Sequence, residues 1–147
     1  MTQNEIRKYL GGNDAVVIQI ANSEDGSPEV AWGDTFFYVR DKSGDQKKMP
    51  FATIVTKDYV GFDSDSKLNR GGLYRINIEV GKEKFEELFG FKPNELENNR
   101  SKFDFTLVNQ FFPHPLYGEN GWVSIINPEK ESIVMVKSLL DFSLERS

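Results

Sequence analysis

The chain has 147 residues, no cysteine, one histidine and a net charge of −5. The absence of cysteine excludes disulfide bonds, thiolate nucleophiles, iron–sulfur clusters and cysteine zinc sites. A single histidine excludes multi-histidine metal centres, so a metal site would need carboxylates for most of its ligands. We therefore expect no metal and no cofactor. A chain of this size buries roughly two-thirds of its surface, which suits one core and a single domain over residues 1–147.

The acidic charge balance, with a sequence pI near 5.0, makes a nucleic-acid partner unlikely. The densest basic spot is only Lys47-Lys48, whereas nucleic-acid binders usually carry a basic stripe. The N-terminus lacks the apolar stretch of a signal peptide, and apolar runs such as 15–18 are far shorter than the ~20 residues of a membrane span. These features predict a soluble cytoplasmic protein with no membrane partner, and they leave the oligomeric state open.

In the first half of the chain the patterns predict one helix and three strands. Thr2 and Glu5 fit a capping box, an apolar stripe follows, and two glycines supply a stop, so a helix is expected near 2–10. The β-branched run near 15–21 predicts a buried strand. Two more strands are expected at 35–39 and 51–56, joined by a hairpin-like connection and paired antiparallel.

The second half continues the alternation of strands and helices. Residues 73–80 show a clean period of two, with one apolar and one polar face, and the helical spacing of apolar residues predicts a helix near 82–89. The polar stretch 91–103 is expected to be an irregular surface segment with local disorder. A strand at 122–126 and an amphipathic helix near 131–145 complete an α+β fold with a mainly antiparallel sheet of about five strands.

The most unusual local feature is the segment 111–118, in which His114 stands between two prolines. Each proline biases the preceding residue toward extended backbone, so the only histidine is presented on a stiff segment. Such a segment suits a general acid or base, or a polar anchor for a ligand. The alternative is structural, with His114 capping a turn or binding a backbone carbonyl between two strands.

The segment 63–68 begins like a calcium-binding loop, with carboxylates at alternate positions. The third ligand position, the glycine position and the distal glutamate position are all filled by unsuitable residues. A structural role, in which Asp63 or Ser64 caps a short helical turn that carries Leu68, explains this composition better.

A polar strand face and several aromatic residues are further candidates for a pocket. Arg75, Asn77 and Glu79 share one face of a strand and could line a polar pocket together with Thr53 and Arg70. The alternative is an ordinary solvated sheet face. Trp32 and Trp122, each at the start of a strand, are candidates for pocket walls, although most aromatic residues are expected in the core.

Several linked blocks resemble an uncharacterised bacterial family of about 150 residues, a domain of unknown function. The most specific block is Pro113-His114-Pro115-Leu116-Tyr117 followed by Gly121-Trp122-Val123-Ser124, and the others are 31–38, 49–58 and 73–78.

A fainter similarity is to the MmcQ/YjbR-like proteins, which share a Trp-Gly before a strand, a late Trp-Val strand and a final helix with paired leucines, here Leu139-Leu140. This similarity implies a compact α+β fold with flanking helices. Proteins of this type are sometimes labelled DNA-binding from the fold alone, a label that the net charge of −5 argues against.

Two functional hypotheses follow. The first is a binding module that receives a small polar molecule or a protein partner in an aromatic-lined groove near His114. The second is a small enzyme that uses His114 as general acid or base on a polar substrate, with Asp34 or Asp65 orienting the ring. The candidate ligand-binding residues are Trp32, Arg70, Arg75, Asn77, His114, Tyr117 and Trp122.

Overall fold

Six strands form one antiparallel sheet in the order β1-β2-β3-β4-β6-β5 in the computed structural model, which describes all of residues 1–147. The strands are β1 (Val16–Ile20), β2 (Thr35–Val39), β3 (Ala52–Val55), β4 (Arg75–Glu79), β5 (Phe112–Pro113) and β6 (Trp122–Ile126). The helices are α1 (Gln3–Gly11), α2 (Gly81–Phe89), α3 (Leu96–Asn99) and α4 (Glu131–Arg146). The expected α+β class with its mainly antiparallel sheet is confirmed.

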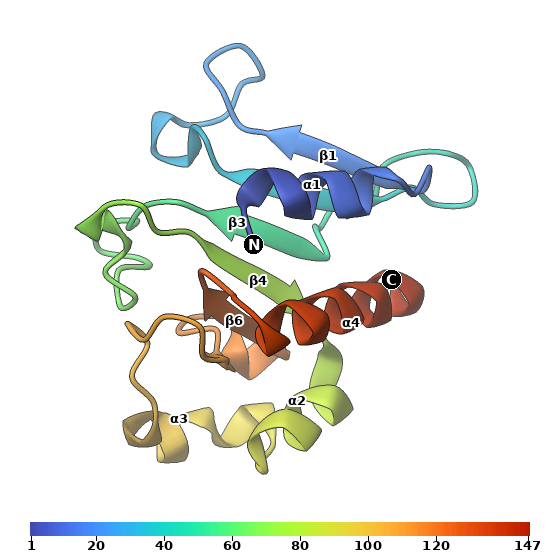
Figure 1. The fold of residues 1–147 in the computed structure, drawn as a ribbon. Coiled ribbons are helices and arrows are strands. Elements are labelled where there is room, and N and C mark those ends of the chain that lie inside the picture. The colour runs from blue at the N-terminus through green and yellow to red at the C-terminus, as the bar shows by residue number, and fades with distance from the viewer.

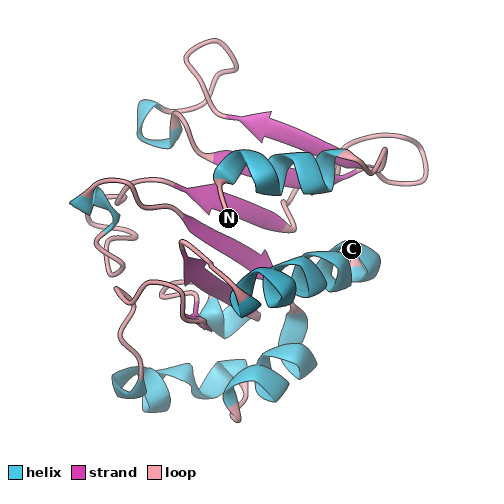
Figure 2. Ribbon diagram, viewed as in Figure 1, coloured by secondary structure: helices cyan, strands magenta, loops and turns pink.

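One face of the sheet packs against α1 and α4, which lie side by side across the strands in Figures 1 and 2. The sequence places apolar residues at alternate positions, and the strand register aligns them, as in the pairs Phe37–Ala52 and Ile76–Ile125. Together with residues of both helices they form a core of 18 buried residues. The buried helix residues in this core are Ile6 and Leu10 of α1, Phe85 of α2, and Val136, Leu139 and Leu140 of α4.

The opposite face of the sheet is not covered by these two helices, and its central row is polar. The same register brings Gln19, Phe36, Thr53, Asn77 and Ser124 into a line that crosses five strands. A polar row at the centre of a sheet needs partners if it is buried. This face therefore carries the features from which a site is built.

The capping box of α1 forms as expected: Thr2 accepts from the Glu5 backbone, and the Glu5 side chain accepts from Thr2. The strand and helix positions expected from periodicity match the structure within one or two residues at each end. The two-residue strand β5 was not expected, since nothing in so short a segment marks it, and it raises the strand count from about five to six.

The expectation of an irregular segment at 91–103 is wrong. The segment contains α3 between two short 3-10 turns, Pro93–Glu95 and Arg100–Lys102. Its phenylalanines explain this order: Phe91 and Phe103 pack against Phe89 of α2, with ring centroids 6.3 and 5.6 Å away. Widely spaced aromatic side chains can anchor a segment that is otherwise polar.

Candidate functional site

A cavity of about 670 Å³ lies on the polar face of the sheet. Four connecting segments form its walls, at residues 25–31, 48–50, 59–63 and 114–117. We call it the sheet-face cavity. Its floor consists of the strand residues Gln19, Phe36, Tyr38, Thr53, Val55, Asn77 and Trp122.

Aromatic and other apolar side chains surround this floor. Phe62 and Tyr117 stand edge to face with ring centroids 6.4 Å apart, and Tyr117 lies 4.9 Å from the His114 ring. Phe62 is 59% exposed and Met49, from another segment, is 75% exposed. Large apolar side chains left in water around a cavity are typical of a binding site rather than of a core.

Beside the floor, on the same strand face as Asn77, Arg75 is completely buried and its guanidinium group is held by three residues. Asp63 accepts two hydrogen bonds, from Nη1 to Oδ1 at 3.1 Å and from Nη2 to Oδ2 at 2.6 Å. Nη1 also donates to Ser66 Oγ at 2.9 Å, and Nε donates to Asn77 Oδ1 at 2.7 Å. The buried charge is therefore neutralised by a bidentate carboxylate.

Asn77 extends this network across the sheet. Its Oδ1 accepts from Ser124 Oγ at 2.7 Å as well as from Arg75, and its Nδ2 donates to Thr53 Oγ1 at 3.0 Å. These partners fix the orientation of the amide, because only its oxygen can accept from Arg75. The polar floor is thus rigid before any ligand arrives.

The His114 side chain is pinned by the turn that follows it. Its Nδ1 accepts hydrogen bonds from the backbone N–H groups of Leu116 and Tyr117, both at 3.0 Å. Burial, and secondly the charge of Arg75, hold the pKa of His114 well below its ordinary value of 6.5. The ring is therefore neutral at pH 7, and since Nδ1 is an acceptor the single proton resides on Nε2.

The Nε2–H group of His114 has no acceptor within hydrogen-bond distance in the protein. Its nearest polar neighbour is Nη2 of Arg75 at 3.2 Å, which is itself a donor. The closest carboxylate oxygen, Oδ2 of Asp63, is 3.8 Å away. Moving the proton to Nδ1 would instead deprive two backbone N–H groups of their acceptor, which is the more costly arrangement. With its proton on Nε2, the contact of His114 with Arg75 Nη2 brings two donors together, so this N–H finds no acceptor in the protein.

Asp34 lies outside the cavity lining but holds one of the wall segments by hydrogen bonds. It is completely buried and accepts hydrogen bonds from the backbone N–H and the hydroxyl of Thr56, both at 2.9 Å, and from the Tyr59 hydroxyl. Burial and the neighbouring Asp34 raise the pKa of Tyr59, so this phenol stays protonated. The role of Asp34 is therefore structural: its hydrogen bonds hold the segment that carries Tyr59 in place.

The structure brings five of the seven ligand-binding candidates together. His114, Asn77, Tyr117 and Trp122 line the cavity, and Arg75 contacts two of them, Asn77 and His114.

Two candidates lie elsewhere. Trp32 is outside the cavity lining and donates from Nε1 to the Ser27 carbonyl. Arg70 binds the carbonyls of Ser66, Lys67 and Thr106, so it ties two loops together.

Neither of the two carboxylates considered as orienters stands beside His114. Asp34 accepts hydrogen bonds from Thr56 and Tyr59, as described above, and Asp65 lies 4.0 Å from Arg100. The carboxylate near the ring is Asp63, whose Oδ2 lies 3.8 Å from Nε2. Contrary to our expectation, neither Asp63 nor Ser64 caps the turn that carries Leu68; the N-cap position is Lys67, and the Leu68 N–H donates to Asp58 Oδ1 at 2.8 Å. The sequence does contain one signal for a carboxylate at this place. Arg75 lies on a strand whose apolar and polar residues alternate, and an arginine that is buried there requires a carboxylate as its partner.

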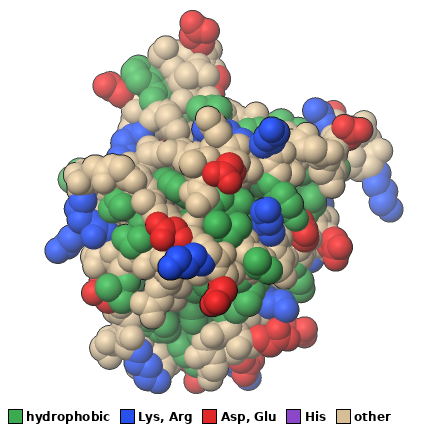
Figure 3. Space-filling view, viewed as in Figure 1, with side chains coloured by type: hydrophobic (Ala, Val, Ile, Leu, Met, Phe, Trp, Pro, Cys, Tyr) green, Lys and Arg blue, Asp and Glu red, His purple; other side chains and the backbone are tan.

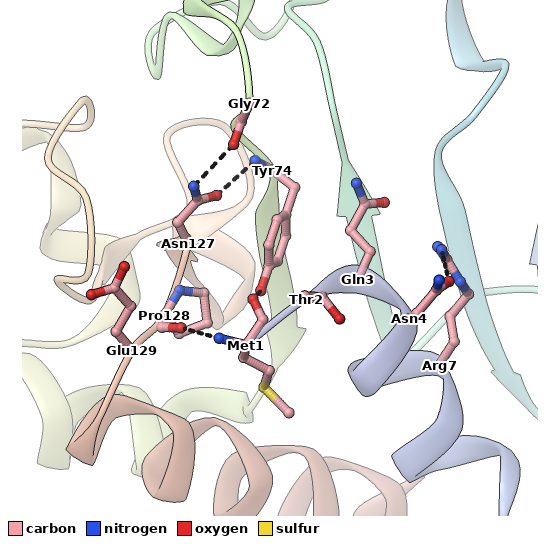
Figure 4. Close-up of a pocket in the computed structure, with 10 residues that line it drawn as sticks. All are labelled: Met1, Thr2, Gln3, Asn4, Arg7, Gly72, Tyr74, Asn127, Pro128 and Glu129. Carbon is pink, nitrogen blue, oxygen red and sulfur yellow. Dashed lines mark hydrogen bonds between the residues drawn. The ribbon is translucent and has the colours of Figure 1, made fainter.

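A second cavity, of about 430 Å³, lies beside the start of α1 on the helix side of the molecule (Figure 4). Its polar groups bind one another: the Met1 amino group donates to the Pro128 carbonyl, Tyr74 donates to the Met1 carbonyl, and Asn127 bonds the backbone of Tyr74 and Gly72. The surface around it mixes acidic, basic and hydrophobic side chains without an extended basic patch (Figure 3). We therefore assign this cavity a structural role in anchoring the N-terminus.

Comparison with known proteins gives a family but no described function. Residues 1–147 match the model of a family of unknown function, DUF6194. The chain belongs to this family. No curated protein and no solved structure matches the chain. No helix of this family member is both long and apolar enough to cross a membrane.

Proposed function

We propose that this protein is a binding module whose sheet-face cavity receives a small molecule with a planar, mainly apolar body and a polar end. The observation that carries the proposal is the Nε2–H of His114, which meets only a second donor, Arg75 Nη2, and belongs to a residue that lines a cavity with aromatic walls. A donor that is already oriented and already desolvated loses little entropy when a ligand oxygen reaches it. The aromatic walls would cover the body of the ligand.

The charges around the cavity support a ligand without strong charge. The charged lining residues are Asp25, Lys48 and Asp63, and the charge of Asp63 is matched by Arg75. Nothing there resembles the cluster of cations that a phosphate chain requires. A small, polar but uncharged molecule is therefore the expected occupant, in preference to nucleic acid.

Catalysis by His114 as a general base has less support than binding. A general base needs a free lone pair, and the only lone pair of the neutral ring is occupied by two backbone N–H groups. A protein partner in the same aromatic-lined groove is the other form of the binding hypothesis from the sequence, and it stays a prediction. A cytoplasmic location, a bacterial origin and the distant relation to MmcQ/YjbR-like proteins stay predictions from the sequence.

A fragment screen by protein-observed NMR tests the proposal. Planar fragments with one polar end should shift the backbone signals of the 59–63 and 114–117 segments, and Phe62→Ala should weaken their binding. Met135→Ala is the control, because Met135 is an exposed apolar residue of α4 outside the cavity lining. Binding that ignores Phe62→Ala, or shifts confined to the other face of the sheet, would overturn the proposal.

A further inference from the structure

The end of the sheet-face cavity at His114 presents a donor and an acceptor next to each other. The donor is Nε2–H of His114, and the acceptor is Oδ2 of Asp63, 3.8 Å away. Both residues line the cavity. Oδ2 already accepts one hydrogen bond from Arg75, but a carboxylate oxygen has capacity for a second.

This pair favours a neutral polar group over a charged one. An anionic group at Nε2 would lie beside the Asp63 carboxylate, and the charge of Arg75 is already compensated by that same carboxylate. A cationic group would lie beside two N–H donors, those of His114 and Arg75. An acceptor atom of a neutral ligand offsets the repulsion between these two donors, whereas a further like charge or like dipole at such short range in a buried site adds to the cost.

We infer that the cavity recognises a planar, uncharged lactam or cyclic amide, whose carbonyl accepts from His114 Nε2–H while its adjacent ring N–H donates to Asp63. This inference rests on the proposed function, because it specifies the ligand of the same cavity. A lactam edge carries its acceptor and its donor on neighbouring atoms in one plane, which complements a neighbouring donor and acceptor in the protein. The ring itself matches the walls, where Tyr117 and Phe62 present aromatic surface.

The polar floor supports the same chemistry. Thr53 Oγ1 accepts from Asn77, so the Thr53 hydroxyl hydrogen remains free to donate to a second oxygen or a ring nitrogen of the ligand. Heterocycles with several lactam groups and ring nitrogens offer such acceptors. The nearest cation in the lining is the exposed Lys48, so phosphate groups on the ligand would contribute little.

Three probes of similar size test this inference on the intact protein: quinolin-2(1H)-one, its N-methyl derivative, and 2-naphthoate. They share a planar bicyclic body, but only the first has both the carbonyl and the ring N–H, and the last carries a negative charge. Affinities would be measured by calorimetry, with tryptophan fluorescence as a second readout, to which Trp122 in the cavity lining and Trp32 outside it both contribute. Since the changes are made in the ligand, the folding of the protein does not affect the comparison.

We expect the lactam to bind about ten-fold or more tightly than its N-methyl derivative and than the carboxylate, as follows from the loss of one buried hydrogen-bond pair. Equal affinities for all three probes would overturn this inference and leave the binding proposal intact. Tightest binding by 2-naphthoate would overturn it in favour of an anion site. If none of the probes binds, this inference fails; if the fragment screen also finds no ligand, the proposed function fails with it.

Discussion

The substitution Asp63→Asn tests the buried polar network most severely. Arg75 is completely buried, and Asp63 is its only charged partner within salt-bridge distance. The amide has the same shape as the carboxylate but no charge, so the variant leaves a guanidinium group inside the protein without compensation. Breaking such a pair from one side costs about 3–5 kcal/mol.

We expect the lower end of that range, about 3 kcal/mol, because the amide oxygen can keep one of the two hydrogen bonds. For a domain of this length, that corresponds to a fall of roughly 6–12 °C in Tm. The assay is urea unfolding followed by circular dichroism. An unchanged m-value, the slope of the free energy of unfolding against urea concentration, would be evidence that the folded state is intact.

Asp65→Asn is the matched control. Its carboxylate is 61% exposed and 4.0 Å from Arg100, so its removal should cost less than about 1 kcal/mol. Replacing Arg75 by methionine in the Asp63→Asn background should recover part of the lost stability, since the stranded charge is then gone. If Asp63→Asn and Asp65→Asn destabilise the protein equally, the description of the buried network is wrong.

Three further predictions concern stability. Because the pKa of His114 is held well below 6.5 in the folded state, only the unfolded chain binds the extra proton near that pH, so the contribution of His114 to stability should be complete above about pH 7. Below pH 6.5 the free energy of unfolding should fall by up to about 1.4 kcal/mol per pH unit, as measured by urea titrations of the wild type. The variant His114→Asn should lack this fall, and an identical slope in both proteins would contradict the prediction. Gly121 has φ +83° and an added Cβ would lie 3.0 Å from the Gly81 backbone, whereas Gly44 has φ +85° and open space around it. Gly121→Ala should therefore lower the free energy of unfolding by about 1–3 kcal/mol more than Gly44→Ala. Equal melting temperatures of the two variants would refute the close approach at Gly121. Thr2→Ala removes the cap of α1 and should cost about 1 kcal/mol in chemical denaturation, while Thr2→Ser, which keeps the hydroxyl, should be nearly neutral.

The elements that sequence predicts well are those whose signals are local. The alternation of Ile76 and Ile78 with Arg75 and Asn77 marks both the strand and its polar face, and the Thr2 capping box marks the start of α1. These features depend on residues a few positions apart, so a linear pattern contains all of the information.

The features that sequence missed depend on residues far apart in the chain. Strand β5 exists because Phe112 and Pro113 pair with β6, and the 91–103 segment is ordered because its phenylalanines reach α2. Likewise, the carboxylate beside His114 is Asp63 rather than Asp34 or Asp65, a choice that depends on how the segment after β3 folds back over β4. Periodicity contains no information on such a contact.

The proton position on His114 is the central claim, since both the proposed function and the ligand class depend on it. Because the chain has one histidine, a 15N NMR spectrum of the labelled imidazole contains a single pair of ring nitrogens. Over pH 5.5–8 it should show a neutral ring with its proton on Nε2 and no titration near 6.5. A ring protonated on Nδ1, or one that titrates with an ordinary pKa, would contradict the account.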